Sequence, residues 1–251
     1  MKIKQFPSIS IVLMLILSLF TMACNKEKGD VTPNVLRKVD KETNSDGTFE
    51  KFTYDVNGRC TKYESKGYTV IYSYNGNTVV ETELPQSGTN GIVTTCTLNA
   101  QGFVASFTFT YSNVNYLYLD EYNAGGFRTK RTAKSKPISS SSFITDFELT
   151  RTYDSDNDLI TLENRGYSTG NSSYSYKYEY DKNHYDTSSN EFSGFDWFGK
   201  NAPHVKIKET YTPSTGSPAV TNYAWFYDEK GYNTRRVSSG ASTITTDFTY
   251  K

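Results

Sequence analysis

Apolar and polar residues alternate with a period of two along most of the chain beyond residue 50. One stretch sets larger apolar side chains against smaller ones: Phe103, Ala105, Phe107, Phe109 and Tyr111 against Val104, Ser106, Thr108 and Thr110. Another alternates four tyrosines with polar residues: Tyr174, Tyr176, Tyr178 and Tyr180. A period of two is that of a β-strand with one apolar face. The pattern therefore predicts an all-β protein.

A turn motif interrupts the alternation: an aromatic residue, Asp or Asn, two variable residues, then Gly. It is clearest at Tyr54–Gly58 and Tyr227–Gly231, and further copies begin at residues 74, 98, 122, 153 and 180. The Asp or Asn side chain caps a backbone N–H two residues on, and the last position requires a positive φ. Asn157 and His184 occupy that last position in two copies, and both residue types tolerate it. The motif predicts a type I turn closed by a glycine bulge.

Successive motifs mostly lie ~20–30 residues apart, which matches two strands and a return loop. The repeat predicts a single large curved antiparallel meander of about 14–16 strands, open or like a flattened barrel. The tight turns should share one end, with longer loops opposite at Pro85–Gly91, Lys134–Ser142 and Gly166–Ser173.

The segment Ser188–His204 departs from the repeat and is rich in aromatic residues. We expect it to run from one end of the sheet to the other and to cover the apolar face. A hydrophobic plug is one interpretation. The other is a ligand platform for a sugar ring, formed by Phe195, Trp197 and Phe198.

The N-terminus carries a targeting pattern. Lys2 and Lys4 precede an uncharged run over Ile9–Phe20, and small Ala23 precedes Cys24. The run is too short to span a bilayer and fits a signal-peptide core. It resembles the signal of bacterial lipoproteins, with Thr21 where Leu is usual. The expected organisation is a signal peptide over 1–23, lipidation at Cys24, a flexible tether over 24–33 and one β-hairpin-repeat domain over 34–251. The alternative for the N-terminal segment is an ordinary secretory signal with an incidental Cys24.

Composition narrows the function classes. Without residues 1–23, 228 residues remain, with 25 Lys and Arg against 27 Asp and Glu. A net charge of −2 lacks the basic excess that nucleic-acid binding requires, so no nucleic-acid partner is expected. Cys60 and Cys96 either form a disulfide, which the oxidising cell envelope permits, or remain as two half-buried thiols on strands.

Candidate chemistry is sparse. His184 and His204 are the two histidines, and neither belongs to an HExxH or GxSxG motif. Asp154, Asp156 and Asp158 resemble the start of a calcium loop. However, Leu159 stands where that loop needs Gly, and Arg165 stands where it needs Glu. We therefore predict no catalytic residues, no metal site and no cofactor.

The lipoprotein signal, polar tether, degenerate Tyr-Asp-x-x-Gly hairpins and late aromatic insertion together resemble a family of Bacteroidetes lipoproteins. That family carries a domain of unknown function described as porin-like. A weaker similarity is to the YD repeats of shell-forming proteins. The family resemblance implies a cell-envelope protein with a curved, many-stranded sheet, and it implies no activity.

The prediction for function is a lipid-anchored, non-catalytic binding or scaffolding module with a glycan or protein ligand. Acylated Cys24 would hold it at the outer membrane, on the cell surface or the periplasmic face. One alternative is an integral outer-membrane β-barrel, because alternation does not say which face points outward. A third is a glycan-active enzyme with a site at the rim.

Overall fold

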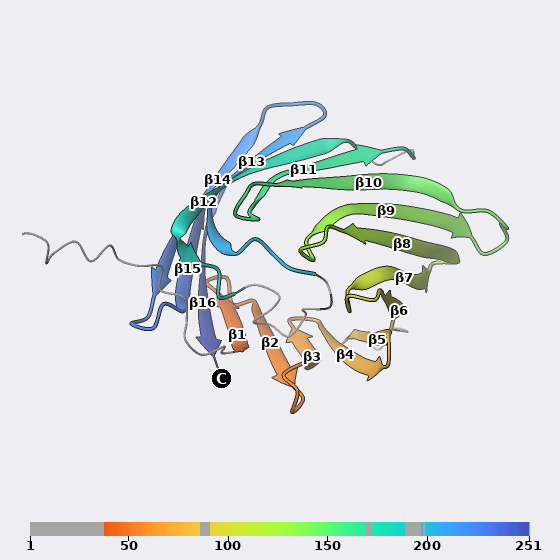
Figure 1. Cartoon of the computed structure of the whole chain (residues 1–251), viewed down its shortest axis with the longest axis horizontal. Coiled ribbons are helices and arrows are strands. Elements are labelled where there is room, and N and C mark those ends of the chain that lie inside the picture. The colour runs from red at the N-terminus through yellow and green to blue at the C-terminus, as the bar shows by residue number, and fades with distance from the viewer. Residues whose placement is uncertain (1–37, 86–90, 169–171, 189–196, 198, 251) are drawn as a thin grey trace, which may run out of the picture.

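The computed structural model describes residues 38–85, 91–168, 172–188, 197 and 199–250. They form sixteen antiparallel strands, each paired with its neighbours in sequence, and β1 pairs with β16 to close a barrel (Figure 1). The strands are β1 (Val39–Asn44), β2 (Phe49–Tyr54), β3 (Cys60–Ser65), β4 (Tyr68–Asn75), β5 (Thr78–Pro85), β6 (Val93–Leu98), β7 (Val104–Tyr111), β8 (Val114–Tyr122), β9 (Arg128–Pro137), β10 (Ile144–Tyr153), β11 (Leu159–Gly166), β12 (Tyr174–Tyr185), β13 (His204–Pro213), β14 (Ala219–Tyr227), β15 (Asn233–Ser239) and β16 (Thr243–Tyr250). The predicted all-β meander is confirmed.

The motif turns lie where the sequence places them, at one end of the barrel that we call the tight-turn end. In the first, Asp55 Oδ1 accepts hydrogen bonds from the backbone N–H groups of Asn57 and Arg59 at 2.9 and 3.0 Å. Gly58 closes this turn at φ +76°. Asn157 takes the glycine position of its copy at φ +68°, as predicted. The strand register shifts by one residue beside the turn, as a bulge requires.

The aromatic residue of the motif also has a structural role. At this end, a tyrosine near the close of an even-numbered strand donates its hydroxyl to the carbonyl of the first residue of the preceding strand. Tyr153 donates to Arg128 O at 2.8 Å, and Tyr180 donates to Leu159 O at 3.0 Å. Tyr54, Tyr74 and Tyr250 do the same. These bonds fix the tight-turn end and hold the tyrosine rings inside the barrel.

One predicted turn is wrong. Tyr180–His184 lies inside β12, where Asn183 N donates to Asp181 Oδ1 at 3.0 Å and the pairing register is irregular. The motif here produces a bulge because β12 continues to pair with β13 beyond it, through Tyr185 and His204. His184 consequently has no positive φ.

The expected end-to-end path of Ser188–His204 is wrong for the same reason. β12 ends and β13 begins at the tight-turn end, and Asp186 N donates to Pro203 O at 2.8 Å there. Lys200 N donates to Gly126 O of a motif turn at 2.9 Å. The described parts of the connection over 186–203 therefore lie at that end. Residues 189–196 and 198 lie outside the described residues.

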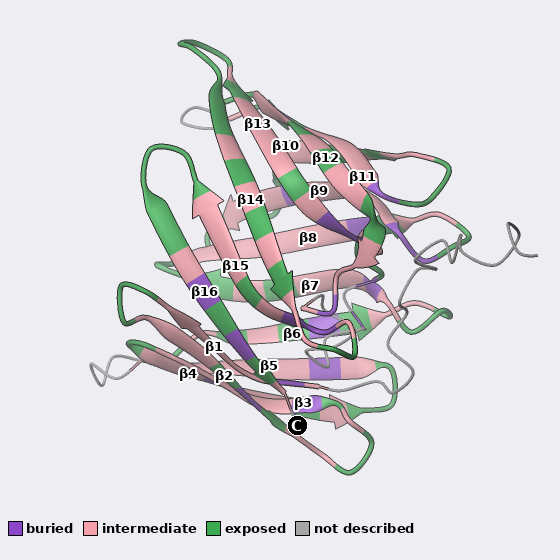
Figure 2. Cartoon of the chain, turned by 90° about the vertical axis from the view of Figure 1, so that its left-hand side faces the viewer, coloured by how far each residue is buried: buried purple, intermediate pink, exposed green. Residues whose placement is uncertain are grey.

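The two faces of the sheet differ in chemistry. The outer face carries ion pairs between neighbouring strands: Lys130–Glu148 at 2.6 Å, Lys208–Glu179 at 2.7 Å and Arg235–Asp247 at 2.6 Å. Threonine and serine fill much of the rest of this face, which also carries exposed apolar side chains such as Val220 and Phe226. Exposed and half-buried positions alternate along the strands (Figure 2).

The inner face carries the aromatic residues. Phe107 stacks on Tyr118 with ring centroids 4.4 Å apart, and Phe109 stacks on Tyr116 at 4.8 Å. Val104, expected on the opposite face from Phe107, is fully buried. The register shift between Thr97 and Leu98 leaves Ala105 as the extra residue, pairs Leu98 with Val104 and so turns Val104 inward.

Candidate functional site

The long connection closes part of the barrel with Trp197. This side chain is 5% exposed and packs against Val79, Cys96 and Val104. Its ring meets Tyr72 edge-on at 5.9 Å. These contacts are those of a core plug. Ligand binding by Trp197 stays a prediction, and Phe195 and Phe198 lie outside the described residues. The predicted signal peptide, Cys24 and the tether also lie outside them.

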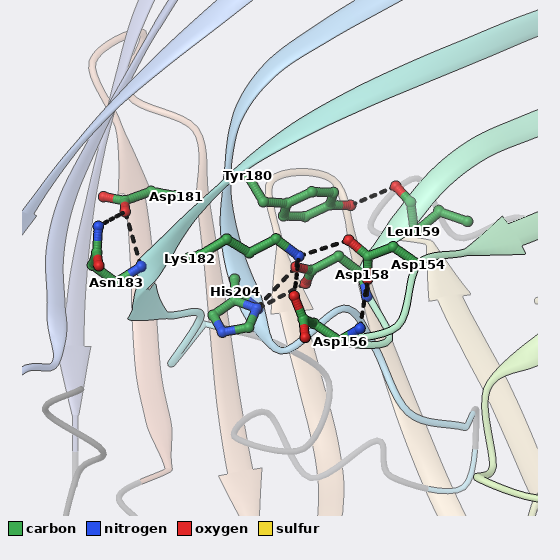
Figure 3. Close-up of polar contacts among 9 residues, drawn as sticks. All are labelled: Asp154, Asp156, Asp158, Leu159, Tyr180, Asp181, Lys182, Asn183 and His204. Atoms are coloured by element: carbon green, nitrogen blue, oxygen red, sulfur yellow. Dashed lines mark hydrogen bonds and ion pairs between the residues drawn. The ribbon is translucent and has the colours of Figure 1, made fainter. Parts of the chain in front are cut away.

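The aspartate-rich turn at 154–158 binds a lysine. Lys182 Nζ on β12 lies 2.6 Å from Asp154 and 3.1 Å from Asp156, and it also contacts Asp158 (Figure 3). The ammonium group thus occupies the place where a cation would sit in a calcium loop. Across the described part of the chain, no group of three or more His, Cys, Asp or Glu side chains is arranged to hold a metal ion.

Asp158 also binds His204, which the sequence left without a partner. The Asp158 carboxylate is fully buried; its Oδ2 lies 2.9 Å from His204 Nδ1, and its Oδ1 accepts from His204 N at 3.2 Å (Figure 3). The residues are 46 apart in sequence, and the pairing of β11 with β12 and of β12 with β13 brings them together. His184 contacts Asp181 instead, at 2.7 Å.

Beside this cluster, and sharing His204 with it, lies a cavity that we call the basic pocket. Its volume is about 250 Å³. Four cationic side chains line it, together with one histidine, one aspartate and three tyrosines: Arg128, Arg151, Lys200, Lys206, His204, Asp186, Tyr153, Tyr178 and Tyr180. The described lining contains no serine, threonine or cysteine.

The arginines beside the pocket share one carboxylate. Arg131 forms a two-point ion pair with Asp120 at 2.7 and 2.6 Å, and Arg128 Nη1 reaches the same carboxylate at 3.1 Å. Arg151 has no carboxylate partner among the described residues, and its buried Nη1 has no hydrogen-bond partner there. Burial, and then the neighbouring Arg128 charge, lower the pKa of Arg151 to about 10.

A second cavity of about 310 Å³ opens on another part of the inner face. Glu81, Glu83, Phe107 and Arg131 are among the residues that line it. Burial, followed by repulsion from Glu83, raises the pKa of Glu81. The interior is therefore acidic over β5 and basic over β9 and β10.

The two thiols are free and buried. Burial raises the pKa of Cys60 to about 11 and that of Cys96 to about 12, which leaves both protonated and unreactive at neutral pH. Of the two interpretations from sequence, half-buried strand thiols and a disulfide, the structure has unpaired thiols in the core.

Sequence reasoning missed the basic pocket, although a signal was present. Arg151 lies between Leu149 and Tyr153 on the period-two face that also carries aromatic residues. A charged residue on that face points into the barrel, where it needs a partner. Lys200 gave no such signal, because its place depends on the connection over 186–203.

Comparison with known proteins agrees with this architecture. No family model matches the chain, and no curated protein matches it. A crystal structure of a porin-like protein from Bacteroides uniformis ATCC 8492 matches with a TM-score of 0.64 and 16% identity, over 85% of this chain and 98% of that chain. One from Bacteroides vulgatus ATCC 8482 matches with a TM-score of 0.64 and 14% identity, over 85% and 99%. The chain has a porin-like fold. The described residues contain no helix with the length and apolar character needed to cross a membrane.

Proposed function

We propose that the protein is a lipid-anchored, non-catalytic binding protein of the cell envelope that holds a small ligand inside its barrel. The observation that carries this proposal is the distribution of residues between the two faces. Ion pairs such as Lys130–Glu148 and Arg235–Asp247 lie outside, whereas most of the aromatic residues and two cavities lie inside.

A barrel embedded in lipid needs the opposite arrangement. Its outer face carries an apolar band about 25 Å tall, and a lysine or arginine at mid-depth costs about 2–4 kcal/mol. Several outward charges on β9, β13 and β15 would face lipid here. The outer surface suits water, so membrane attachment falls to an acyl group on Cys24.

The alternative of an integral outer-membrane barrel is favoured by one observation. The sheet closes, and several connections at the end opposite the motif turns are long, such as the one between β9 and β10. Closure alone also serves a water-soluble container, because it leaves no strand edge unpaired.

A single substitution separates the two functions. Full-length protein and its Cys24→Ser variant are expressed with their own N-terminus, and membrane and soluble fractions are compared without detergent. We expect the unsubstituted protein in the membrane fraction and Cys24→Ser in the soluble fraction. Residues 25–251 purified without detergent should sediment as a soluble particle. Recovery of residues 25–251, which lack the apolar run of the signal, only in detergent would establish the integral barrel instead.

A further inference from the structure

We propose that the basic pocket binds a small organic anion, whose carboxylate or phosphate group sits between Arg151 and Lys200. This inference rests on the proposed function, because it names the class of ligand that the barrel holds. It depends on three features of the pocket: its unpaired cations, its fixed tyrosine rings and its size.

The carboxylates around the pocket already have partners. Asp120 binds Arg128 and Arg131. Glu209 binds Lys206 at 2.6 Å. Asp186 accepts hydrogen bonds from Ser188 and Asn233. Two cations of the lining are left without a carboxylate among the described residues.

Those two cations are Arg151 and Lys200. Arg151 projects inward from β10, with Nη1 buried and without a hydrogen-bond acceptor in the described structure. Lys200 comes from the connection over 186–203, where its Nζ lies 6.0 Å from the centre of the Phe127 ring. An unpaired buried guanidinium is costly, and a bound oxyanion removes that cost through charge-assisted hydrogen bonds. The planar fork of arginine matches the oxygens of a carboxylate or a phosphate.

The tyrosines provide the rest of the site. Tyr153 and Tyr180 donate their hydroxyls to backbone carbonyls, so their rings are held in place along the cavity wall. Fixed aromatic faces favour the C–H surface of a sugar or another compact ring. A cavity of about 250 Å³ has room for a single ring with one anionic group.

The test is calorimetric titration of residues 25–251 with glucose 6-phosphate, glucuronate, inorganic phosphate and glucose. We expect one or both of the anionic sugars to bind, and glucose not to bind. Binding of glucose 6-phosphate alone assigns a phosphate group, and binding of glucuronate alone assigns a carboxylate; each supports the proposal.

Arg151→Met keeps the length of the side chain and removes its charge. It should weaken binding by about 10–100-fold, the effect of losing one charge-assisted pair. The matched control is Arg165→Met on the neighbouring strand, where Arg165 is exposed and lies over the Tyr167 ring. It should bind as the unsubstituted protein does.

Thermal unfolding shows whether a loss of binding comes from a loss of folding. Because Arg151→Met removes an unpaired buried charge, its melting temperature should be unchanged or raised. Equal affinity of Arg151→Met and the unsubstituted protein, or no anion binding by a soluble, folded barrel, would overturn the proposal. If the barrel proves to need detergent, the proposed function fails while the same titration in detergent still tests the anion site.

Discussion

Asp120 and Asp158 show how individual side chains place charge inside this barrel. Neither side chain is exposed to solvent, and each carboxylate contacts two cationic or histidine partners. Paired in this way, a buried carboxylate is tolerated, whereas removal of one partner leaves an uncompensated charge. Arg151 differs from these paired charges, because its buried Nη1 has no hydrogen-bond partner among the described residues. For that reason we take it as the marker of the candidate site.

Glu42 carries a prediction about pH. Burial, then repulsion from Glu50, raises the pKa of its carboxyl to about 7, from 4.5 in the unfolded chain. The folded state therefore binds more protons than the unfolded state between these values, and stability should fall as pH rises through that window. Glu42→Gln should raise the free energy of unfolding by about 1–3 kcal/mol at pH 8. At pH 4, where Glu42 is neutral in the folded state and mostly neutral in the unfolded state, the difference between the two proteins should nearly vanish.

Urea denaturation at both pH values measures this effect. Glu64→Gln is the control, because a hydrogen bond from Lys62 lowers the pKa of Glu64. The stabilising effect of that carboxylate is present at high pH and lost as pH falls, so this variant should lose stability at pH 8. An unchanged pH dependence in Glu42→Gln would contradict the assignment.

Hairpin turns are the elements that the sequence specified best. The capping Asp or Asn and the positive φ act within five residues, so the motif predicts them without knowledge of the fold. Tyr180–His184 shows the limit of this reasoning: its Asp caps locally as elsewhere, yet pairing between β12 and β13 overrides the turn. The predicted outward orientation of Val104 is wrong for a related reason. The bulge that follows the turn moves this side chain to the inner face.

Two motif glycines form a matched test of the turn. Gly102 and Gly126 occupy the same position, at φ +83° and +87°. A Cβ at Gly102 would meet nothing within 4 Å, whereas one at Gly126 would lie 2.7 Å from the Phe103 ring. Gly102→Ala should cost about 1–2 kcal/mol from backbone strain alone. Gly126→Ala should cost about 1–3 kcal/mol more through overpacking. Chemical denaturation measures both, and equal unfolding midpoints would show that Phe103 yields freely.

Over the whole molecule, the sequence predicted the strand number and the motif turns at one end, but not closure or the site. Closure pairs β1 with β16, about 200 residues apart, and alternation is the same in an open sheet. The basic pocket combines residues of β9 to β13 with the connection over 186–203. Local patterns predict which residues point inward. They do not predict which of them meet across the barrel.

Closure itself can be tested by a disulfide across the seam. Lys41 on β1 and Thr249 on β16 are directly opposite and point outward, and Thr249 Oγ1 donates to Lys41 O at 3.3 Å. In residues 25–251, Lys41→Cys with Thr249→Cys should oxidise to an intramolecular disulfide, because Cys60 and Cys96 are buried and do not compete. The bridge links residues 208 apart, so chain entropy allows up to ~5 kcal/mol of stabilisation.

Lys41→Cys with Lys51→Cys is the control, since this pair lies opposite in the β1–β2 hairpin and oxidises whether or not the barrel closes. Its short loop should give only ~3 kcal/mol. Thiol titration and denaturation of the oxidised proteins measure both effects, and oxidation of the control pair without the seam pair would establish an open sheet in place of a barrel.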